Sequence, residues 1–224
     1  MDEAARSLSA TGRTRLRRFP ERGRTDRADL EAILDDGLMC FVGAVVEGSP
    51  RVVPMVYGRI NDTLYLHGSV ANQVLTAARD GAELCVSVTD VDELVLANSL
   101  FHHSVNFRSA MIYGRGRLVT DQREQVAGLR AAADQLVPGR SATLDAPTRK
   151  QLAATIVIAL PLEEASVKVR QGPPNGEAGD YDRPIWAGVL PLTQTWGEPL
   201  SDPKLRTATA IPDHVADMAG RPLR

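Results

Sequence analysis

The chain has 224 residues, of which 43% are hydrophobic, 24% charged and only 4% aromatic, and its formal net charge is -2. Domains hold about 150 residues on average, so this length suggests one large domain or two small ones. A balanced charge with this apolar content excludes an intrinsically disordered chain. The longest apolar runs are far shorter than the about 18 residues of a membrane-spanning helix, and the Arg-rich start lacks the apolar segment of a secretory signal. We therefore expect a cytoplasmic protein that does not enter a membrane.

The positive charge is concentrated at the N-terminus. Residues 1–27 hold eight arginines against four acidic residues, a net charge of +4, and residues 1–25 show no apolar periodicity. This composition predicts an extended basic arm. Such an arm can bind nucleic acid, but a charge of +4 is modest and the rest of the chain is acidic, so a nucleic-acid partner is not expected.

Cysteine and histidine indicate no metal centre. Cys40 and Cys85 lie in apolar surroundings and form no Cys-x-x-Cys pair, which predicts buried free thiols rather than a disulfide or a zinc site. His102 and His103 are adjacent, so in an extended chain they point to opposite sides and do not share one metal. A single imidazole is enough for an axial haem ligand, and that possibility stays open.

A short amphipathic helix is the first predicted element. Asp26 is a suitable N-cap, and Leu30, Ile33 and Leu34 form a stripe with helical spacing. Gly37 ends the helix.

The segments that follow have mainly strand composition. Turn residues at 47–50 and 61–62 separate the first three of them, which predicts an antiparallel meander. Segments 38–46, 51–60, 63–67, 83–88, 107–119, 154–169 and 185–193 are predicted strands, and 71–78, 121–136 and 145–153 are predicted helices. Hairpin spacing rather than strictly alternating strands and helices argues against a parallel doubly wound sheet. It favours a mainly β protein, an antiparallel sheet closed into a small barrel with peripheral helices.

The familiar catalytic motifs are absent: no dinucleotide-binding glycine motif, phosphate loop, nucleophile elbow or His-Glu-x-x-His is present. Two denser constellations remain. Residues 49–55 and 65–69, followed by a helix start, suit a phosphate because free N–H groups at a helix start favour anions. Residues 103–109 carry amide, guanidinium and hydroxyl groups that suit a polar heteroaromatic ligand. Read by spacing alone, both are more typical of strand ends and turns than of a ligand site.

Five segments, taken together and in order, resemble the pyridoxamine 5′-phosphate oxidase-like family. The resemblance runs from about residue 13 to about residue 215, and it is closest to a branch of flavin-nucleotide-binding proteins related to the nitroimidazole-resistance reductases. The segments are 51–54, 64–69, 102–109, 167–174 and 185–191.

The resemblance implies a dimeric split β-barrel with two flavin sites at the dimer interface, each built from both protomers. Composition divides the chain into a basic arm over 1–25, a barrel over 26–196 and an irregular tail over 197–224, and the resemblance makes the barrel the flavin-binding part. The cofactor-binding residues that it implies are Arg51, Val53, Pro54, His67, Gly68, Ser69, Asn72, Asn106, Arg108, Ser109, Lys168, Arg170 and Trp186. No general acid or base is evident, and His103 and Lys168 are the catalytic candidates.

The chain departs from the family just after His67-Gly68-Ser69. Many relatives have Arg or Lys there to hold the flavin phosphate, whereas this chain has Ala71, Asn72 and Gln73. Losing the cation removes a charge-assisted hydrogen bond, so phosphate binding is weakened or moved to Arg51, Arg108 or the arginines of the arm. FMN, FAD, a deazaflavin and haem all stay open as ligands.

Two functions are compatible with this sequence. The first is a flavin-dependent oxidoreductase acting on a small molecule, in which the flavin carries the redox chemistry. The second is a non-catalytic protein of the same fold that stores or senses flavin or haem.

Overall fold

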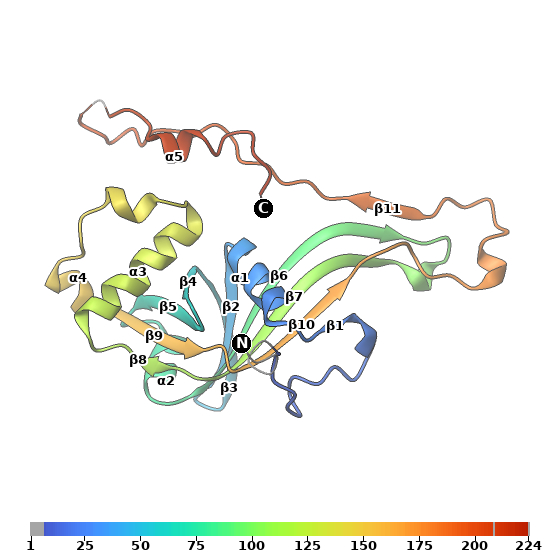
Figure 1. Cartoon of the computed structure of the whole chain (residues 1–224), viewed down its shortest axis with the longest axis horizontal. Helices are drawn as coiled ribbons and strands as arrows, with labels where there is room; N and C mark the ends of the chain where they lie inside the picture. The colour runs from blue at the N-terminus through green and yellow to red at the C-terminus, as the bar shows by residue number, and fades with distance from the viewer. Residues whose placement is uncertain (1–6, 208, 224) are drawn as a thin grey trace.

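The computed structural model describes residues 7–207 and 209–223. Within them the chain forms an antiparallel split β-barrel with helices at its margins, as predicted (Figure 1). One sheet has seven strands in the order β1-β10-β7-β6-β2-β3, with β11 paired to β6, and the other has four in the order β4-β5-β9-β8. The strands are β1 (Gly23–Arg24), β2 (Cys40–Val46), β3 (Ser49–Met55), β4 (Tyr57–Ile60), β5 (Thr63–Ser69), β6 (Glu83–Leu96), β7 (Ser104–Arg115), β8 (Arg117–Leu118), β9 (Thr155–Pro161), β10 (Glu164–Arg170) and β11 (Gly188–Pro191). The α-helices are α1 (Arg27–Asp36), α2 (Gln73–Arg79), α3 (Gln122–Leu136), α4 (Arg149–Ala153) and α5 (Asp213–Ala216).

The core lies between the two sheets and is closed by α1. Val42, Val86 and Ile112 face one another on three neighbouring strands and are fully buried. The predicted helical stripe is confirmed, since α1 begins at the Asp26 cap and buries Leu30, Ile33 and Leu34. Alternation along the strands therefore directs one face of the seven-stranded sheet into the core and leaves the other outside.

The predicted meander is wrong within its second strand. The run 51–60 is two strands, because β3 pairs with β2 in one sheet and β4 pairs with β5 in the other. The run 154–169 divides in the same way into β9 and β10. Both runs have continuous strand composition, so composition alone does not reveal where the chain leaves one sheet for the next. These crossings are what join the sheets into a barrel.

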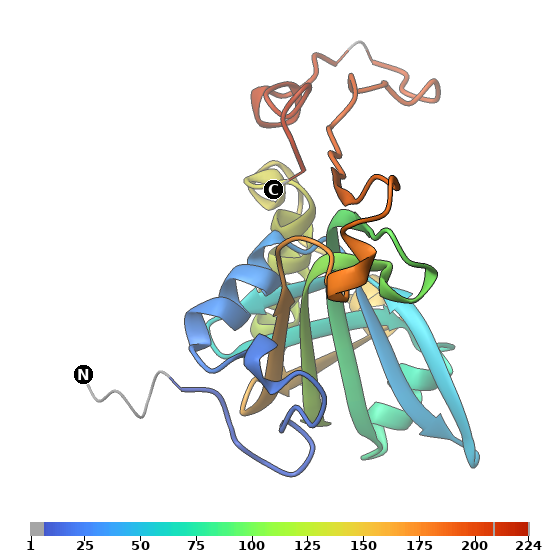
Figure 2. The ribbon, with the colours of Figure 1, turned by 90° about the vertical axis from the view of Figure 1, so that its right-hand side faces the viewer.

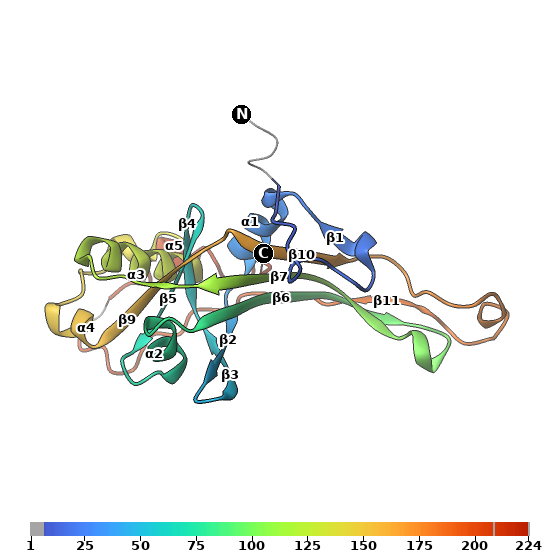
Figure 3. The same ribbon diagram turned by 90° about the horizontal axis from the view of Figure 1, so that it is seen from below.

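Strand β6 is longer than predicted, and together with β7 it extends beyond the barrel. Figures 1 and 3 show them leaving it as a curved ribbon, flanked by β10 and β11. Asp90, Asp92 and Glu93 are poor strand formers, and the register shifts between Val91 and Glu93. Strand composition therefore ends at residue 88, whereas pairing to β7 carries the strand to residue 96.

The described part of the predicted arm lies against the barrel rather than extending into solvent. Gly23 of β1 pairs with Lys168 of β10, and Arg13 forms ion pairs with Glu83 and Glu164. Residues 1–6 of the predicted arm lie outside the described residues. Figure 3 shows the docked segment beside β10.

The C-terminal tail returns above the body after β11 (Figure 2). It folds on itself through a bridge between Thr195 and Pro222, and its short helix is α5. Residues 208 and 224 of this segment are outside the described part. No helix in the described residues is long and apolar enough to cross a bilayer.

Candidate functional site

The outer surface of the seven-stranded sheet carries a row of polar side chains. Register places Thr89 of β6 opposite Ser109 of β7, and Ser109 opposite Lys168 of β10. The Thr89 hydroxyl donates a hydrogen bond to Ser109 Oγ at 3.1 Å. We call this surface the open face and define it by Phe41, Ser87, Thr89, Val91, Ser109 and Lys168.

Apolar side chains border this polar row. Phe41 is 49% exposed and Val91 39% exposed, so the open face combines hydroxyls and one ammonium group with uncovered apolar surface. Ligand sites typically have this composition, a largely apolar floor with a few polar groups that fix orientation. The arrangement suits a flat heteroaromatic ring with a polar edge.

Arg108 lies on the opposite face of the sheet from Ser109, because neighbouring residues of a strand point to opposite sides. Its Nε and Nη2 donate to Asp92 at 3.2 Å, and its Nη1 donates to Asp36 Oδ2 at 2.9 Å. All three guanidinium nitrogens thus already have carboxylate acceptors. The structure does not bring the predicted ligands Arg108 and Ser109 together.

Asp90 adds a third carboxyl group beside Arg108. One of its oxygens is buried without a hydrogen-bond partner. Burial raises the pKa of this carboxyl, and Arg108 partly opposes the rise. The carboxyl borders a cavity of about 280 Å³ that the tail residues Leu192 and Leu223 also line.

Asn106 and Arg170, both predicted cofactor-binding residues, lie together. Arg170 Nη1 donates to Asn106 Oδ1, and Asn106 Nδ2 donates to the Gly172 carbonyl at 3.1 Å. Asn106 is 1% exposed and Arg170 is 4% exposed. The Arg170 Nε is buried without a partner.

The helix start predicted as a phosphate seat is capped from within the chain. Asn72 Oδ1 accepts from the Val74 and Leu75 N–H groups at 3.0 and 3.1 Å. Ser69 Oγ accepts from the Ala71 N–H at 3.2 Å. These donors are therefore already satisfied where a phosphate was expected.

His67 is half-buried near the end of β5. Its Nδ1 is buried and has no hydrogen-bond partner, and burial lowers the pKa of the imidazole. Its ring is consequently neutral near pH 7, with a lone pair available to a ligand or a metal.

The remaining candidates lie toward the end of the extended ribbon or on the edge strand. His103 Nδ1 is 3.0 Å from the Ser99 carbonyl oxygen and the residue is exposed. Trp186 is 67% exposed. On the edge strand β3, Arg51 and Pro54 are exposed and Val53 packs against the core.

Comparison with known proteins identifies the family. The sequence matches the family described as pyridoxamine 5′-phosphate oxidase over residues 26–169. This chain belongs to that family. The predicted resemblance is therefore confirmed, although no curated protein matches the sequence.

Two solved structures of similar proteins align with this family member over nearly its whole length. The FAD and heme binding protein from Mycobacterium smegmatis is 37% identical, with a TM-score of 0.84, and the match covers 91% of this chain and 99% of that one. The flavocytochrome Anf3 from Azotobacter vinelandii is 34% identical, with a TM-score of 0.87 and coverage of 96% and 100%. A putative 5-nitroimidazole antibiotic resistance protein from Bacteroides thetaiotaomicron is 25% identical, with a TM-score of 0.56 and coverage of 66% and 86%.

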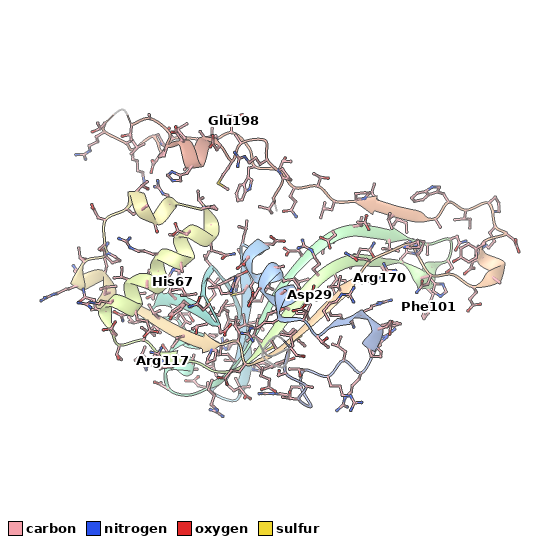
Figure 4. The ribbon with its side chains drawn as sticks, in the orientation of Figure 1. Asp29, His67, Phe101, Arg117, Arg170 and Glu198 are labelled. Atoms are coloured by element: carbon pink, nitrogen blue, oxygen red, sulfur yellow. The ribbon has the colours of Figure 1, made fainter. Side chains whose placement is uncertain are left out.

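Seven of the residues implied by the family resemblance fall into two groups within one chain. His67, Gly68, Ser69 and Asn72 lie at the barrel end, and Ser109, Lys168 and Arg170 lie along the extended half. Figure 4 shows His67 on the barrel half of the molecule and Arg170 on the extended half. Within one protomer of this family member, the two groups therefore lie apart.

Sequence reasoning missed Ser87, Thr89 and Phe41, which share the open face with Ser109. Apolar and polar residues alternate from 83 to 89, which is the sequence signal for a continuing strand. The acidic residues at 90 and 92 interrupt the strand-like composition of this segment. Their placement opposite Ser109 depends on register with β7, which a single sequence does not contain.

Proposed function

We propose that this protein binds a flavin nucleotide, with FAD as the nucleotide and the flavin ring on the open face. The observation that carries the proposal is the match along almost the whole chain to a structure whose protein binds FAD and heme. The open face supports it independently, because its hydroxyl row and Lys168 offer donors and acceptors to a polar ring edge.

We further propose that two copies pair through the open face and complete each other's sites. Phe41, Val45 and Val52 are between 49% and 66% exposed on this side of the sheet, and contiguous exposed apolar surface marks an interaction site. A twofold axis through the face would bring the barrel end of one copy to the extended half of the other. This accounts for the separation of His67 from Lys168 within one chain.

The proposed reaction is an oxidation or reduction of a small molecule. A bound flavin supplies hydride or electron transfer, and the protein binds it, orients it and excludes water. Lys168 places a positive charge on the open face, where it favours negative charge on a ring beside it. Of the two catalytic candidates, Lys168 is on this face and His103 is not.

Identification of the ligand tests the proposal. The purified protein is denatured and the released molecule is identified by mass spectrometry, which separates FAD from FMN, a deazaflavin and haem. Bleaching of an oxidised-flavin spectrum by NADPH, with no other enzyme present, supports the oxidoreductase. A stable flavin that no donor reduces supports storage or sensing instead, and a haem spectrum without flavin contradicts flavin binding.

Haem binding is the second candidate, and a specific observation favours it. His67 presents a buried, unpartnered Nδ1 on a neutral ring, the form in which imidazole ligates iron. The tail residue His214 also has a buried, unpartnered nitrogen, its Nε2. The two relatives that match over nearly the whole chain are named as a FAD and heme binding protein and as a flavocytochrome.

Replacement of His67 by alanine should abolish a haem Soret band while leaving bound flavin in place, because the axial nitrogen is lost. The measurement is the ratio of Soret to flavin absorbance in protein purified with added haem. His214→Ala tests whether the unpartnered Nε2 of His214 is the haem ligand instead. His102→Ala is the matched control, since its Nδ1 is already 2.7 Å from Ser99 Oγ. An unchanged Soret band in the variants at positions 67 and 214 contradicts a ligand role for either.

A further inference from the structure

Cationic side chains surround a single phenylalanine of the docked arm. The guanidinium carbons of Arg18 and Arg22 lie 5.0 and 4.0 Å from the centroid of the Phe19 ring. Lys168 Nζ of strand β10 lies 5.9 Å from the same centroid. We call Arg18, Phe19, Arg22, Lys168 and Arg170 the arm cluster.

No close ion pair neutralises the cluster among the described residues, although the Glu93 carboxylate accepts a hydrogen bond from Asn106, the partner of Arg170. Elsewhere in the chain, arginines form close ion pairs, such as Arg27 with Asp62 at 2.7 Å and Arg117 with Glu124 at 2.6 Å. Among the described residues, the one ion pair of the cluster is the weak contact of Arg22 Nε with Glu21 at 3.9 Å. An aromatic face attracts cations but does not neutralise them, so the cluster keeps an excess of positive charge.

Arg170, which is buried, also forms no ion pair among the described residues. It is 4% exposed, its Nη groups donate only to neutral oxygens of Asn106, Gly172 and Pro173, and its Nε has no partner. Burial and the charge of Arg22 lower its pKa. A buried guanidinium with a free N–H and no counter-ion is costly unless an anion completes the site.

The arrangement is fixed by backbone structure. Phe19 adopts a left-handed conformation with φ 56° and ψ 59°, which is unfavourable for a residue with a side chain. The Arg22 N–H donates to the Phe19 carbonyl at 3.1 Å. Pairing of Gly23 with Lys168 then holds this turn beside β10.

Other places for the flavin phosphate are less suitable. The N–H groups at the start of α2 are capped by Asn72 and Ser69, and Arg108 is occupied by two aspartates. Arg51 is one exposed cation on an edge strand. The arm cluster instead combines several cations with a buried N–H donor, and Lys168 belongs both to it and to the open face.

We propose that the arm cluster binds the phosphate or pyrophosphate group of the flavin nucleotide, taking over from the cation that is absent after Ser69. The inference rests on the proposed function, since it places the charged part of that ligand. Arg18 and Arg22 of the arm and Arg170 of the sheet supply the N–H donors, and Lys168 links them to the ring on the open face. Paired guanidinium groups suit phosphate oxygens in geometry and charge.

The test compares three probes, FAD, riboflavin and inorganic pyrophosphate, by calorimetric titration of the protein freed of ligand. The Arg18→Gln/Arg22→Gln double variant should weaken FAD binding about tenfold or more, as expected for lost charge-assisted bonds. It should abolish pyrophosphate binding and leave riboflavin affinity unchanged. The Arg15→Gln/Arg17→Gln double variant removes the same charge from the same arm and should bind all three like the unchanged protein.

The outcomes separate this inference from the proposed function. Equal FAD affinity in the cluster variant and the unchanged protein overturns the inference and leaves flavin binding intact. Pyrophosphate binding that is lost in the cluster variant, in a protein that binds no flavin, supports the anion site and overturns the proposed function. Failure of the unchanged protein to bind either probe overturns both, and thermal melting verifies that each variant is folded.

Discussion

Exchange of Arg108 for methionine is expected to lower the free energy of unfolding at pH 7 by about 2 to 3 kcal/mol, because breaking a largely buried ion pair leaves uncompensated carboxylates. Arg108 bridges Asp36 and Asp92, and its charge also acts on Asp90. The side chains of the bridge are between 25% and 35% exposed, so solvent screening keeps the effect below the roughly 3 to 5 kcal/mol of fully buried pairs. Urea denaturation followed by circular dichroism measures it.

The stability lost on exchange of Arg108 for methionine should increase as the pH rises. Burial and the neighbouring aspartates already raise the pKa of Asp90, and Arg108 lowers it. Without Arg108 the folded-state pKa of Asp90 rises further above that of the unfolded chain. A group whose pKa is raised by folding adds stability below its unfolded pKa and loses it as the pH rises through the folded value. The deficit of the variant should therefore be small near pH 4 and grow toward pH 7.

Arg51→Met is the matched control, since Arg51 is an exposed arginine of strand β3 with no ion pair among the described residues. It should change stability by less than about 0.5 kcal/mol, as is usual for surface positions. A variant at position 108 that melts like the unchanged protein but no longer retains flavin would contradict the structural role. Arg108 would then be a cofactor ligand, as the family resemblance implied.

Elements dictated by local sequence could be predicted. The cap at Asp26 and the stripe of Leu30, Ile33 and Leu34 fix α1 through contacts within a few residues, and the structure has both. Helix α3 begins one residue after its Asp121 cap for the same reason. Family motifs then supplied the split barrel, which periodicity alone did not reach.

Features that depend on long-range pairing could not be predicted. Arg108 meets Asp36 across 72 positions of sequence, and nothing near either residue indicates that contact. The open face requires β6, β7 and β10 in one register. A one-residue shift in register would exchange its hydroxyls for core residues.

The arm illustrates the same limit. Its composition correctly indicated positive charge but not where that charge lies. Only the pairing of Gly23 with Lys168 brings Arg18 and Arg22 to the sheet. The sequence predicts the basic arm and the cofactor-site residue Lys168 separately, whereas the fold brings them into one cluster.

Replacement of Gly58 by alanine should lower the free energy of unfolding by about 3 kcal/mol, the upper range for inserting a group into a tightly packed core. Gly58 is on β4, where the chain has crossed to the four-stranded sheet and meets α3. A Cβ there would lie 2.5 Å from the Ala132 nitrogen and 2.6 Å from the Ala131 carbonyl carbon. These atoms belong to helix backbone, which has no rotamer with which to move aside.

In thermal melting, the melting temperature of the Gly58→Ala variant should fall by about 6 to 12 °C, since each kcal/mol corresponds to about 2 to 4 °C for a domain of this size. Gly12→Ala is the control, because nothing lies within 4 Å of a Cβ at that position. Since Gly58 lies on neither the open face nor the arm cluster, ligand affinity measured well below the melting temperature should stay unchanged. A loss below about 1 kcal/mol would mean that α3 can move away from β4 at little cost, and the close seating of the helix would then not be what holds the four-stranded sheet in place.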